Sequence, residues 1–329
     1  MDLSIVIINY KCADFTLNCL KSVFEFTRGI SFEVIVVDND SKDDSKKRIV
    51  GSYPQIKWIE MTCNAGFSRA NNAGMKEAQG RHILLLNADT LVFDDVISRC
   101  FHRLETNPDI AAIGGIQLYE DKSPMPFYRS FAEIRRTFFI LPNKPFFQQI
   151  LHKTIPETLY ADPNQVDWLV AAFLMVKGET IEKAGKMDED FFLYGEDVEW
   201  SGRLGKAGKL CYFDDIRFIH LENKNPFRRE NISWVNRFSV QMQVSNFLWV
   251  RKQYGIAAYL VLIIHYLTLA PMFFIWKIMV NIKSFRNPFF QLENQLIFAR
   301  KTKVILKYFF KTIFKMKYFY KISPHENIK

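Results

Sequence analysis

Two aspartates stand at the ends of apolar runs, where a side chain can reach a bound ligand. Asp38 follows the run 34–37, and Asp89 follows the run 83–86, two residues beyond Asn87. Such runs are typical of buried parallel strands, and ligands of open α/β sheets bind at the carboxyl ends of these strands. Asp38 is therefore placed to accept hydrogen bonds from a base or a ribose, and Asp89 to hold a cation against an anionic diphosphate.

Turn formation explains the same residues without a ligand. Asn87 and Asp89 can start a turn and cap a helix that begins near Asp94, because short polar side chains bond to neighbouring backbone groups. Asp38 can likewise form a local turn, with Asp43 as the cap of the next helix. Both alternatives stay open for each residue taken by itself.

The segment 64–74 has the residues of a phosphate-binding helix start. Gly66 permits close backbone approach, the positive end of the helix favours anions, and Arg69 adds a charge. An ordinary helix start explains the segment nearly as well. The chain lacks Gly-x-Gly-x-x-Gly after its first strand and lacks a P-loop motif, which argues against a nicotinamide dehydrogenase and a P-loop enzyme.

Asp197 is the candidate general base. It follows the apolar segment 191–194, which excludes water, and it stands near the head of a short helix. A carboxylate in such a place can take a proton from a substrate hydroxyl. Alternatively, Glu196 and Asp197 only complement the helix dipole, which is worth about 0.3–1 kcal/mol at an exposed terminus.

Strands and helices alternate through the first 116 residues, as in a parallel sheet flanked by helices. The sequence predicts strands over 4–9, 32–37, 56–60, 83–86 and 110–116. It predicts helices over 14–26, after 43, over 68–79 and over 94–106. The predicted fold class is α/β, with a mostly parallel sheet.

The remaining globular part is predicted to be less regular. Residues 117–165 contain six prolines and are expected to form an irregular lid or binding loop. Beyond them the sequence predicts strands over 166–176, 209–213 and 216–221, and helices over 179–184 and 196–206. We expect a catalytic domain over 1–250, with a nucleotide-binding half over 1–116 and an acceptor half over 117–250, and a helical tail over 251–329.

The positive charge of the chain lies in that tail. The net charge is +9, but residues 251–329 carry +12 and residues 1–250 carry −3. A nucleic-acid enzyme would carry its positive field around the active domain, so we expect no nucleic-acid partner. The five cysteines form no Cys-x-x-Cys pair, which fits a reducing compartment and predicts neither disulfides nor a zinc site. The first eight residues lack a basic segment and predict a strand, not a signal peptide.

Five motifs, in order, resemble those of the family 2 inverting glycosyltransferases. They are Ser4-Ile5-Val6-Ile7-Ile8-Asn9-Tyr10, Val37-Asp38-Asn39, Asn64-Ala65-Gly66-Phe67, Asn87-Ala88-Asp89 and Gly195-Glu196-Asp197. The branch that adds rhamnose or galactofuranose to bacterial surface polysaccharides looks nearest, and the resemblance covers roughly residues 3–222. It implies the GT-A fold, a nucleoside-diphosphate sugar as donor, and a glycan or lipid-linked acceptor.

The resemblance also implies a role for each motif. Asp197 is the catalytic base, Asp89 holds Mg²⁺ or Mn²⁺ on the diphosphate, and His220 stands where relatives place a histidine that can join the metal. A lone histidine at a strand end can equally be structural. Trp168 and Glu196 are assigned to the acceptor side. Donor binding is assigned to Asn9, Asp38, Asn64, Gly66, Arg69 and Asn87.

Two positions depart from the family pattern. Asn87 replaces the first carboxylate of the Asp-x-Asp motif, which leaves Asp89 as the lone charged ligand and suggests that Asn87 touches ribose or sugar. Ala171 and Ala172 stand where a glycine usually precedes the small residues of the acceptor-side strand, and we expect them to narrow the acceptor pocket. Because charge on the leaving diphosphate is neutralised while Asp197 works from the opposite face, a single displacement inverts the anomeric centre.

The tail is predicted to meet a membrane. Residues 256–276 are long and apolar enough to span a bilayer, but Pro271 interrupts them. A single crossing would place the eight basic residues within 300–321 outside, against the positive-inside rule, so we expect an interfacial helix or a re-entrant hairpin. An amphipathic helix should then carry one stripe for anionic lipid, formed by Lys303, Lys307, Lys311 and Lys315.

These features predict peripheral or monotopic attachment to the cytoplasmic face of the inner (plasma) membrane. A solvated basic face on a helix packed against the protein is the alternative for the tail. Two other functions also stay open. A sugar-phosphate nucleotidyltransferase would need a Gly-rich basic loop after the first strand, which residues 9–12 do not supply. A catalytically inactive membrane scaffold would not need both Asp89 and Asp197.

Overall fold

The computed structural model describes residues 1–142, 144–221 and 239–317. The strands are β1 (Leu3–Asn9), β2 (Phe32–Asp38), β3 (Lys57–Glu60), β4 (His82–Asn87), β5 (Thr90–Leu91), β6 (Ile110–Leu118), β7 (Phe173–Lys177) and β8 (Lys209–His220). The helices of the sheet domain are α1 (Ala13–Phe26), α2 (Ser45–Ser52), α3 (Phe67–Glu77), α4 (Val96–Thr106), α5 (Phe131–Phe138), α6 (Pro145–Thr154), α7 (Gly178–Ala184) and α8 (Glu196–Leu204). Three helices follow, α9 (Val240–Lys283), α10 (Glu293–Lys307) and α11 (Phe309–Ile313).

The strands form one mixed sheet in the order β3-β2-β1-β4-β7-β6-β8-β5. Its first four strands are parallel, because each of the helices that connect them returns the chain to the same edge. β7 runs antiparallel to both β4 and β6, and β8 runs parallel to β6. The predicted α/β class is therefore confirmed.

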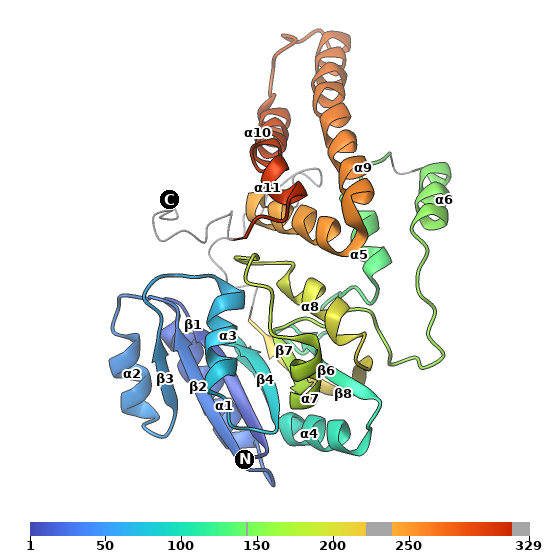
Figure 1. Cartoon of the computed structure of the whole chain (residues 1–329). Coiled ribbons are helices and arrows are strands. Elements are labelled where there is room, and N and C mark those ends of the chain that lie inside the picture. The colour runs from blue at the N-terminus through green and yellow to red at the C-terminus, as the bar shows by residue number, and fades with distance from the viewer. Residues whose placement is uncertain (143, 222–238, 318–329) are drawn as a thin grey trace.

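Helices cover both faces of this sheet (Figure 1). Side chains of α1, α2 and α4 pack on one face in the largest core cluster. Side chains of α3, α7 and α8 pack on the other face in a second cluster. Because β1, β2 and β4 are buried on both sides, they are apolar at nearly every position.

The middle of the chain is more regular than the sequence predicts. Residues 117–165 contain α5, whose start is fixed by a capping box between Ser130 and Glu133, and α6, which begins at a proline. The strand predicted over 166–176 begins only at Phe173. Before it, Asp167 accepts hydrogen bonds from Tyr160 Oη and from the backbone N–H of Phe131, which ties this segment to α5.

Two further boundaries differ from the predictions. The strands predicted over 209–213 and 216–221 are one strand, β8, whose pairing with β6 shifts register between Gly114 and Ile116. α9 continues through Pro271 and breaks instead at Gly255, where φ is 84°. A left-handed φ is accessible to glycine without steric cost, so the break falls there.

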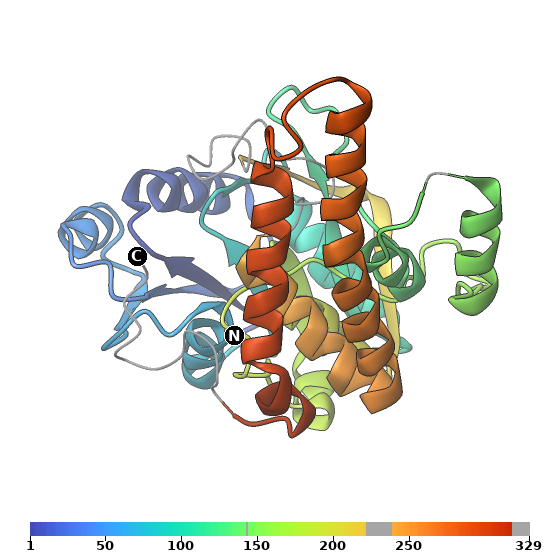
Figure 2. The same ribbon diagram turned by 90° about the horizontal axis from the view of Figure 1, so that it is seen from above.

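The helices after the break form an antiparallel hairpin that stands away from the sheet (Figures 1 and 2). Phe298 of α10 stacks on Tyr266 and Phe273 of α9, with ring centroids 5.5 and 5.6 Å apart. The turn of this hairpin lies between α9 and α10, beyond residues 256–276, and the interfacial or re-entrant placement of that segment stays a prediction. The single helix predicted for Lys303 to Lys315 is wrong, because α10 ends at Lys307 and α11 begins at Phe309. Lys321 of the predicted basic segment lies outside the described residues.

Candidate active site

Three neighbouring parallel strands end on polar side chains at one edge of the sheet. Asn9 ends β1, Asp38 ends β2 and Asn87 ends β4. The register pairs Asn9 with Asp38 and Ile8 with Asn87, so the strand ends are nearly level. The structure thus brings these three predicted donor-side residues to the edge where α/β folds bind ligands.

Asp38 is held in one orientation by its neighbours. Asn9 Nδ2 donates to Asp38 Oδ1 over 2.7 Å. Ser41 donates to the same carboxylate from its hydroxyl over 2.5 Å and from its backbone N–H over 3.0 Å. Thr16 Oγ1 donates to Asn9 Oδ1 over 2.9 Å, and Asn9 is 0% exposed. Asn9 therefore lies behind Asp38 and positions it, and its assignment to donor binding stays a prediction.

His220 lies beside Asp89. β5 and β8 pair Thr90 with His220, which places His220 Nε2 3.2 Å from Asp89 Oδ1. On the other side of the ring, His220 Nδ1 lies 2.6 Å from Gln117 Oε1. An amide oxygen can only accept, so the N–H of Nδ1 donates to Gln117, and Nε2 is the ring nitrogen that faces Asp89.

This pair fits a divalent cation. Two acceptors 3.2 Å apart are stabilised by a positive charge between them, and Mg²⁺ or Mn²⁺ accepts carboxylate oxygen together with imidazole or water. Among the described residues, no group of three or more His, Cys, Asp or Glu side chains could hold a metal ion. The phosphate oxygens of a ligand would therefore have to supply further coordination. A hollow of about 270 Å³ adjoins His220 and is lined by Tyr119, Glu120 and Asp121.

The helix start at 64–69 is fastened to a loop far away in the sequence, residues 187–195. The backbone N–H of Phe67 donates to Phe192 O over 2.7 Å. A Cβ on Gly66, whose φ is 87°, would lie 2.3 Å from that oxygen, so only glycine permits this approach. Arg69 Nε lies 3.7 Å from Glu189 Oε2. Gly66 and Arg69 therefore hold the 187–195 loop, and their binding of a phosphate stays a prediction.

Neighbouring amides complete this attachment. Asn64 Oδ1 accepts hydrogen bonds from Asn39 Nδ2 over 2.9 Å and from the backbone N–H of Gly66 over 3.2 Å, so Asn64 shapes the turn before α3. Asn72 of α3 donates to Met187 O over 2.9 Å and accepts from the Met187 N–H over 3.0 Å. Asn72 was not singled out from the sequence, because nothing local marks a partner that lies 115 residues away. Asn39 belongs to the Val37-Asp38-Asn39 motif but was given no role of its own.

The other side of the 187–195 loop is held by α9. Gln241 Nε2 and Ser245 Oγ both donate to Leu193 O, over 3.1 and 2.9 Å. Lys252 Nζ forms ion pairs with Asp188 and, over 2.5 Å, with Asp190. The segment of α9 before Gly255 thus belongs structurally to the site, and the predicted domain boundary at 250 falls inside this helix.

The 187–195 loop leads directly into Asp197, in the first turn of α8. Burial raises the pKa of Asp197 to about 6, although the N–H groups of Val198 and Ala171 and the indole of Trp168 act in the opposite direction. The Val198 N–H donates to Asp197 Oδ1 over 2.9 Å. A carboxylate with a pKa near the working pH is ionised at neutrality and still basic enough to receive a proton. The indole of Trp168 thus lies near Asp197, and its role on the acceptor side stays a prediction.

Glu196 occupies a different environment from its neighbour. Its side chain is buried, and its Oε2 finds no hydrogen-bond partner within the described chain. Burial, and then the charge of Asp197, raise the pKa of Glu196 well above its usual value. Like charges on adjacent carboxyl groups repel, so ionisation of Asp197 favours the protonated form of Glu196.

Asp197 and the Asn87–Asp89 turn meet across one dipeptide. The N–H of Ala171 lies close enough to Asp197 to lower its pKa, and the carbonyl of Ala172 accepts the backbone N–H of Asn87 over 3.0 Å. Both alanines are buried. Since neighbouring residues are only about 3.8 Å apart along the chain, the predicted base and the predicted cation-binding turn lie on either side of Ala171–Ala172.

A comparison with known families adds to this geometry. Residues 4–162 match the family described as "Glycosyl transferase family 2". Residues 4–162 therefore form a glycosyl transferase family 2 domain. This confirms the resemblance predicted from the five motifs, four of which lie inside the matched range. The fifth motif, Gly195-Glu196-Asp197, lies beyond it.

Several curated relatives of this chain are rhamnosyltransferases or hexosyltransferases. An N-acetylglucosaminyl-diphospho-decaprenol L-rhamnosyltransferase of Mycobacterium tuberculosis is 26% identical over 57% of this chain and 66% of its own length. A low-salt glycan biosynthesis hexosyltransferase of Haloferax volcanii is 29% identical over 61% of each chain. The rhamnosyltransferase WbbL of Escherichia coli is 28% identical over 60% of this chain and 77% of its own length. The chain thus spans less than two thirds of the length of the first two of these relatives.

Solved structures share the fold. The mannosyltransferase PcManGT from Pyrobaculum calidifontis, in complex with GDP-Man and Mn²⁺, has a TM-score of 0.52 and 13% identity, covering 93% of this chain and 74% of that one. GalNAc-T7 with UDP, GalNAc and Mn²⁺ has a TM-score of 0.56 and 14% identity, covering 94% of this chain and 57% of that one. These likenesses confirm the predicted GT-A glycosyltransferase fold.

Proposed function

We propose that this chain is an inverting glycosyltransferase of cell-surface polysaccharide synthesis. It moves a sugar from a nucleoside-diphosphate sugar to a hydroxyl of a glycan or lipid-linked acceptor. The observation that carries the proposal is the meeting of Asp197 and the Asn87–Asp89 turn across Ala171–Ala172, on a family 2 domain. One group can then serve the attacking hydroxyl while the other serves the leaving diphosphate.

Donor binding falls to the edge formed by β1, β2 and β4. Asp38 accepts hydrogen bonds from the nucleoside, in the orientation that Asn9 and Ser41 impose. Asn87, half-buried at the end of β4, contacts the ribose or the sugar. Asp89 and His220 hold Mg²⁺ or Mn²⁺, which neutralises charge on the departing diphosphate when bound. The Mn²⁺ present in two structural neighbours supports a divalent ion.

Asp197 removes the proton from the acceptor hydroxyl. Its raised pKa, of about 6, keeps the carboxylate both ionised and basic near neutral pH. The hydroxyl oxygen forms its bond to the anomeric carbon as the bond to the diphosphate breaks, so a single displacement inverts that centre. Trp168 and the buried Glu196 shape the acceptor side around the base.

The hairpin attaches the enzyme to a membrane. Within the described ranges, α9 is the one helix long and apolar enough to cross a bilayer. Its outward face keeps large apolar side chains exposed, among them Val261, Ile264, Met272 and Ile275. Lys303, Lys307 and Lys311 are exposed on the returning helices, where they suit anionic lipid. We place this attachment, peripheral or monotopic, on the cytoplasmic face of the inner membrane, where the lipid-linked acceptor is available.

The test is a transfer assay. Purified protein is incubated with Mn²⁺ or Mg²⁺, a panel of nucleoside-diphosphate sugars that includes a rhamnose donor, and lipid-linked acceptors. Rhamnose is tested first because two of the relatives are rhamnosyltransferases. We expect one donor to be consumed, with loss of product when the cation is chelated. A folded protein that consumes no donor would favour the scaffold alternative.

A further inference from the structure

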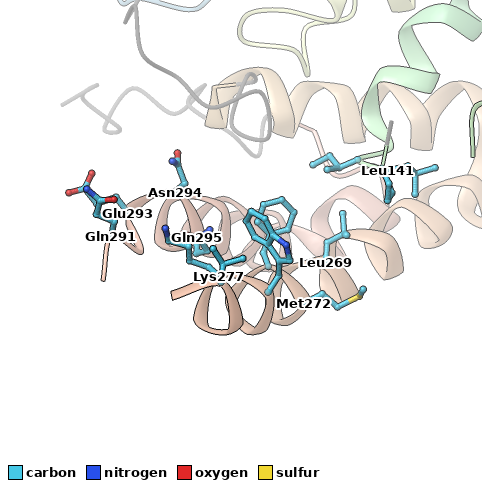
Figure 3. A pocket seen from close by; sticks show the side chains of 13 residues that line it. Leu141, Leu269, Met272, Lys277, Gln291, Glu293, Asn294 and Gln295 are labelled. Atoms are coloured by element: carbon cyan, nitrogen blue, oxygen red, sulfur yellow. The ribbon is translucent and has the colours of Figure 1, made fainter. Parts of the chain in front are cut away.

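The hairpin contains a cavity that the proposed reaction does not use. It has a volume of about 870 Å³ and lies between the segment 140–142, α9 and α10 (Figure 3). Its lining includes apolar side chains such as Leu141, Leu269 and Phe273, and charged side chains from Lys277 and Glu293. This volume falls in the range of small-molecule sites.

The two ends of the cavity differ in chemistry. Leu141 and Leu269 line one end, whereas Gln291, Glu293 and Asn294 line the other (Figure 3). The polar end carries one cation, from Lys277, and one anion, from Glu293. A ligand that fits this lining has a hydrocarbon part and a polar part with both signs of charge.

Gln295 has a buried side-chain oxygen without a hydrogen-bond donor among the described residues, which is an independent indication of a ligand. Its side chain lines the cavity and is 5% exposed, and its Oε1 accepts no hydrogen bond from the described part of the chain. Buried polar atoms are normally paired, so this oxygen calls for a donor from outside the chain. A primary ammonium group supplies three donor hydrogens, whereas a quaternary ammonium supplies none.

The cavity opens beside the surface that we assign to the membrane. Met272 and Trp276 line it and are also 60% and 57% exposed on the outer face of α9. Ile275 and Met279 extend the same apolar face. A lipid chain can therefore pass from the bilayer into the cavity without crossing water.

We propose that this cavity binds one phospholipid with a primary-amine head, of the phosphatidylethanolamine class. Its acyl chain packs on Leu141, Leu269 and Phe273. The phosphate faces Lys277, and the ammonium faces Glu293 and donates to Gln295 Oε1. The inference rests on the membrane attachment of the hairpin and not on the transfer reaction, so either can fail without the other.

Native mass spectrometry of the full chain in detergent tests the proposal. Equimolar dioleoyl phosphatidylethanolamine and dioleoyl phosphatidylcholine are added, since these two lipids differ only in the methylation of the amine. We expect the primary-amine lipid to be retained about ten-fold more than its quaternary counterpart. Equal retention, or preference for phosphatidylcholine through the Trp276 ring, would overturn the proposal.

Variants locate the binding. Gln295→Leu and Glu293→Gln should each bring the ratio of the two lipids close to one, and Leu269→Trp should remove both lipids by filling the apolar end. Gln148→Leu, on the exposed surface of α6, is the matched control and should keep the wild-type preference. Because Glu293 is exposed, its variant folds even if the buried change at Gln295 does not. A wild-type ratio in Glu293→Gln would contradict the assigned head-group site.

Discussion

At the scale of single residues, the site rests on two acidic groups in different surroundings. Asp89 is half-exposed and adjoins His220, which Gln117 orients. Asp197 is half-buried among protein groups, and its desolvation raises its pKa to about 6. A carboxylate that water can reach stays ionised and can bind a cation, whereas a desolvated carboxylate has a raised pKa and can accept a proton. The two environments therefore match the two proposed roles.

Asp197→Asn should abolish transfer and preserve donor binding. The amide is nearly isosteric but cannot accept a proton, so we expect kcat to fall by about 10²–10⁴-fold. The measurement pairs a rate assay with calorimetric titration of the donor. Asp214→Asn, an exposed aspartate on β8, is the control. Wild-type turnover in Asp197→Asn would remove that residue from the mechanism.

The pH dependence of transfer follows from the same carboxylate. The pKa of Asp197 is about 6, and only its ionised form accepts a proton, so kcat/KM should fall as the pH is lowered through about 6. Above about pH 6 the titration of Asp197 causes no further change in kcat/KM. An acid limb that persists unchanged in the residual activity of Asp197→Asn would show that another group is titrating.

Gln117→Leu tests the orientation of His220. Without the amide oxygen, Nδ1 loses its acceptor and the ring can present the wrong nitrogen to the cation. We expect the affinity for Mn²⁺ to be about 10–100-fold weaker, with kcat restored at saturating metal. Asp89→Ala should instead lose metal-dependent donor binding altogether. Unchanged metal affinity in Gln117→Leu would mean that His220 is structural.

At the scale of elements, short-range patterns predicted most of the sheet domain. Strands that are buried on both faces of a parallel sheet are apolar at nearly every position. The apolar runs before Asn9, Asp38 and Asn87 therefore predicted strands, and the structure has them. The helix α5 was missed although its capping box, Ser130 to Glu133, is visible in the sequence. The sequence predicted a helix break at Pro271, but the helix continues through this residue. The break lies at Gly255, which the prediction did not name.

The attachments of the site could not be predicted in this way. Sequence placed Asp197 near a helix start, but it could not reveal that Phe192 meets Gly66 or that Leu193 meets Ser245. These contacts join positions more than fifty residues apart, and no local pattern encodes them. The same holds for Gln117, whose role appears only when β6 and β8 are paired.

Lys252→Met tests whether α9 positions the 187–195 loop. Loss of the ion pairs with Asp188 and Asp190 frees the loop that leads into Asp197, and small displacements of a base are costly. We expect kcat to fall about 10–100-fold with the KM for donor unchanged. The control is Lys206→Met, at an exposed lysine after α8. A rise in donor KM alone would contradict a role in positioning the base.

At the scale of the whole molecule, a sheet domain of slightly negative charge is joined to a basic, apolar hairpin. The two parts share the 187–195 loop, because α9 holds that loop before it continues into the hairpin. The arrangement keeps the proposed base, Asp197, close to the hairpin that we propose to meet the membrane. It suits an acceptor that is itself anchored in lipid.

Replacing Lys303, Lys307 and Lys311 by Gln should weaken vesicle binding. Each exposed lysine contributes about 1 kcal/mol on anionic lipid, so the triple variant should bind at most about a hundred-fold more weakly. Sedimentation with phosphatidylglycerol vesicles measures this, and wild-type binding should weaken as salt is added. Binding to neutral vesicles should not change. Salt-independent binding, equal in both proteins, would assign these lysines to solvent.

The central claim is that a hydroxyl activated by Asp197 displaces a diphosphate held at Asp89 in one step. NMR of the product from the first active donor in the nucleotide-sugar panel tests it most directly, because the anomeric proton reports configuration. The account predicts a product whose anomeric configuration is inverted relative to the donor. A product with retained configuration would contradict it.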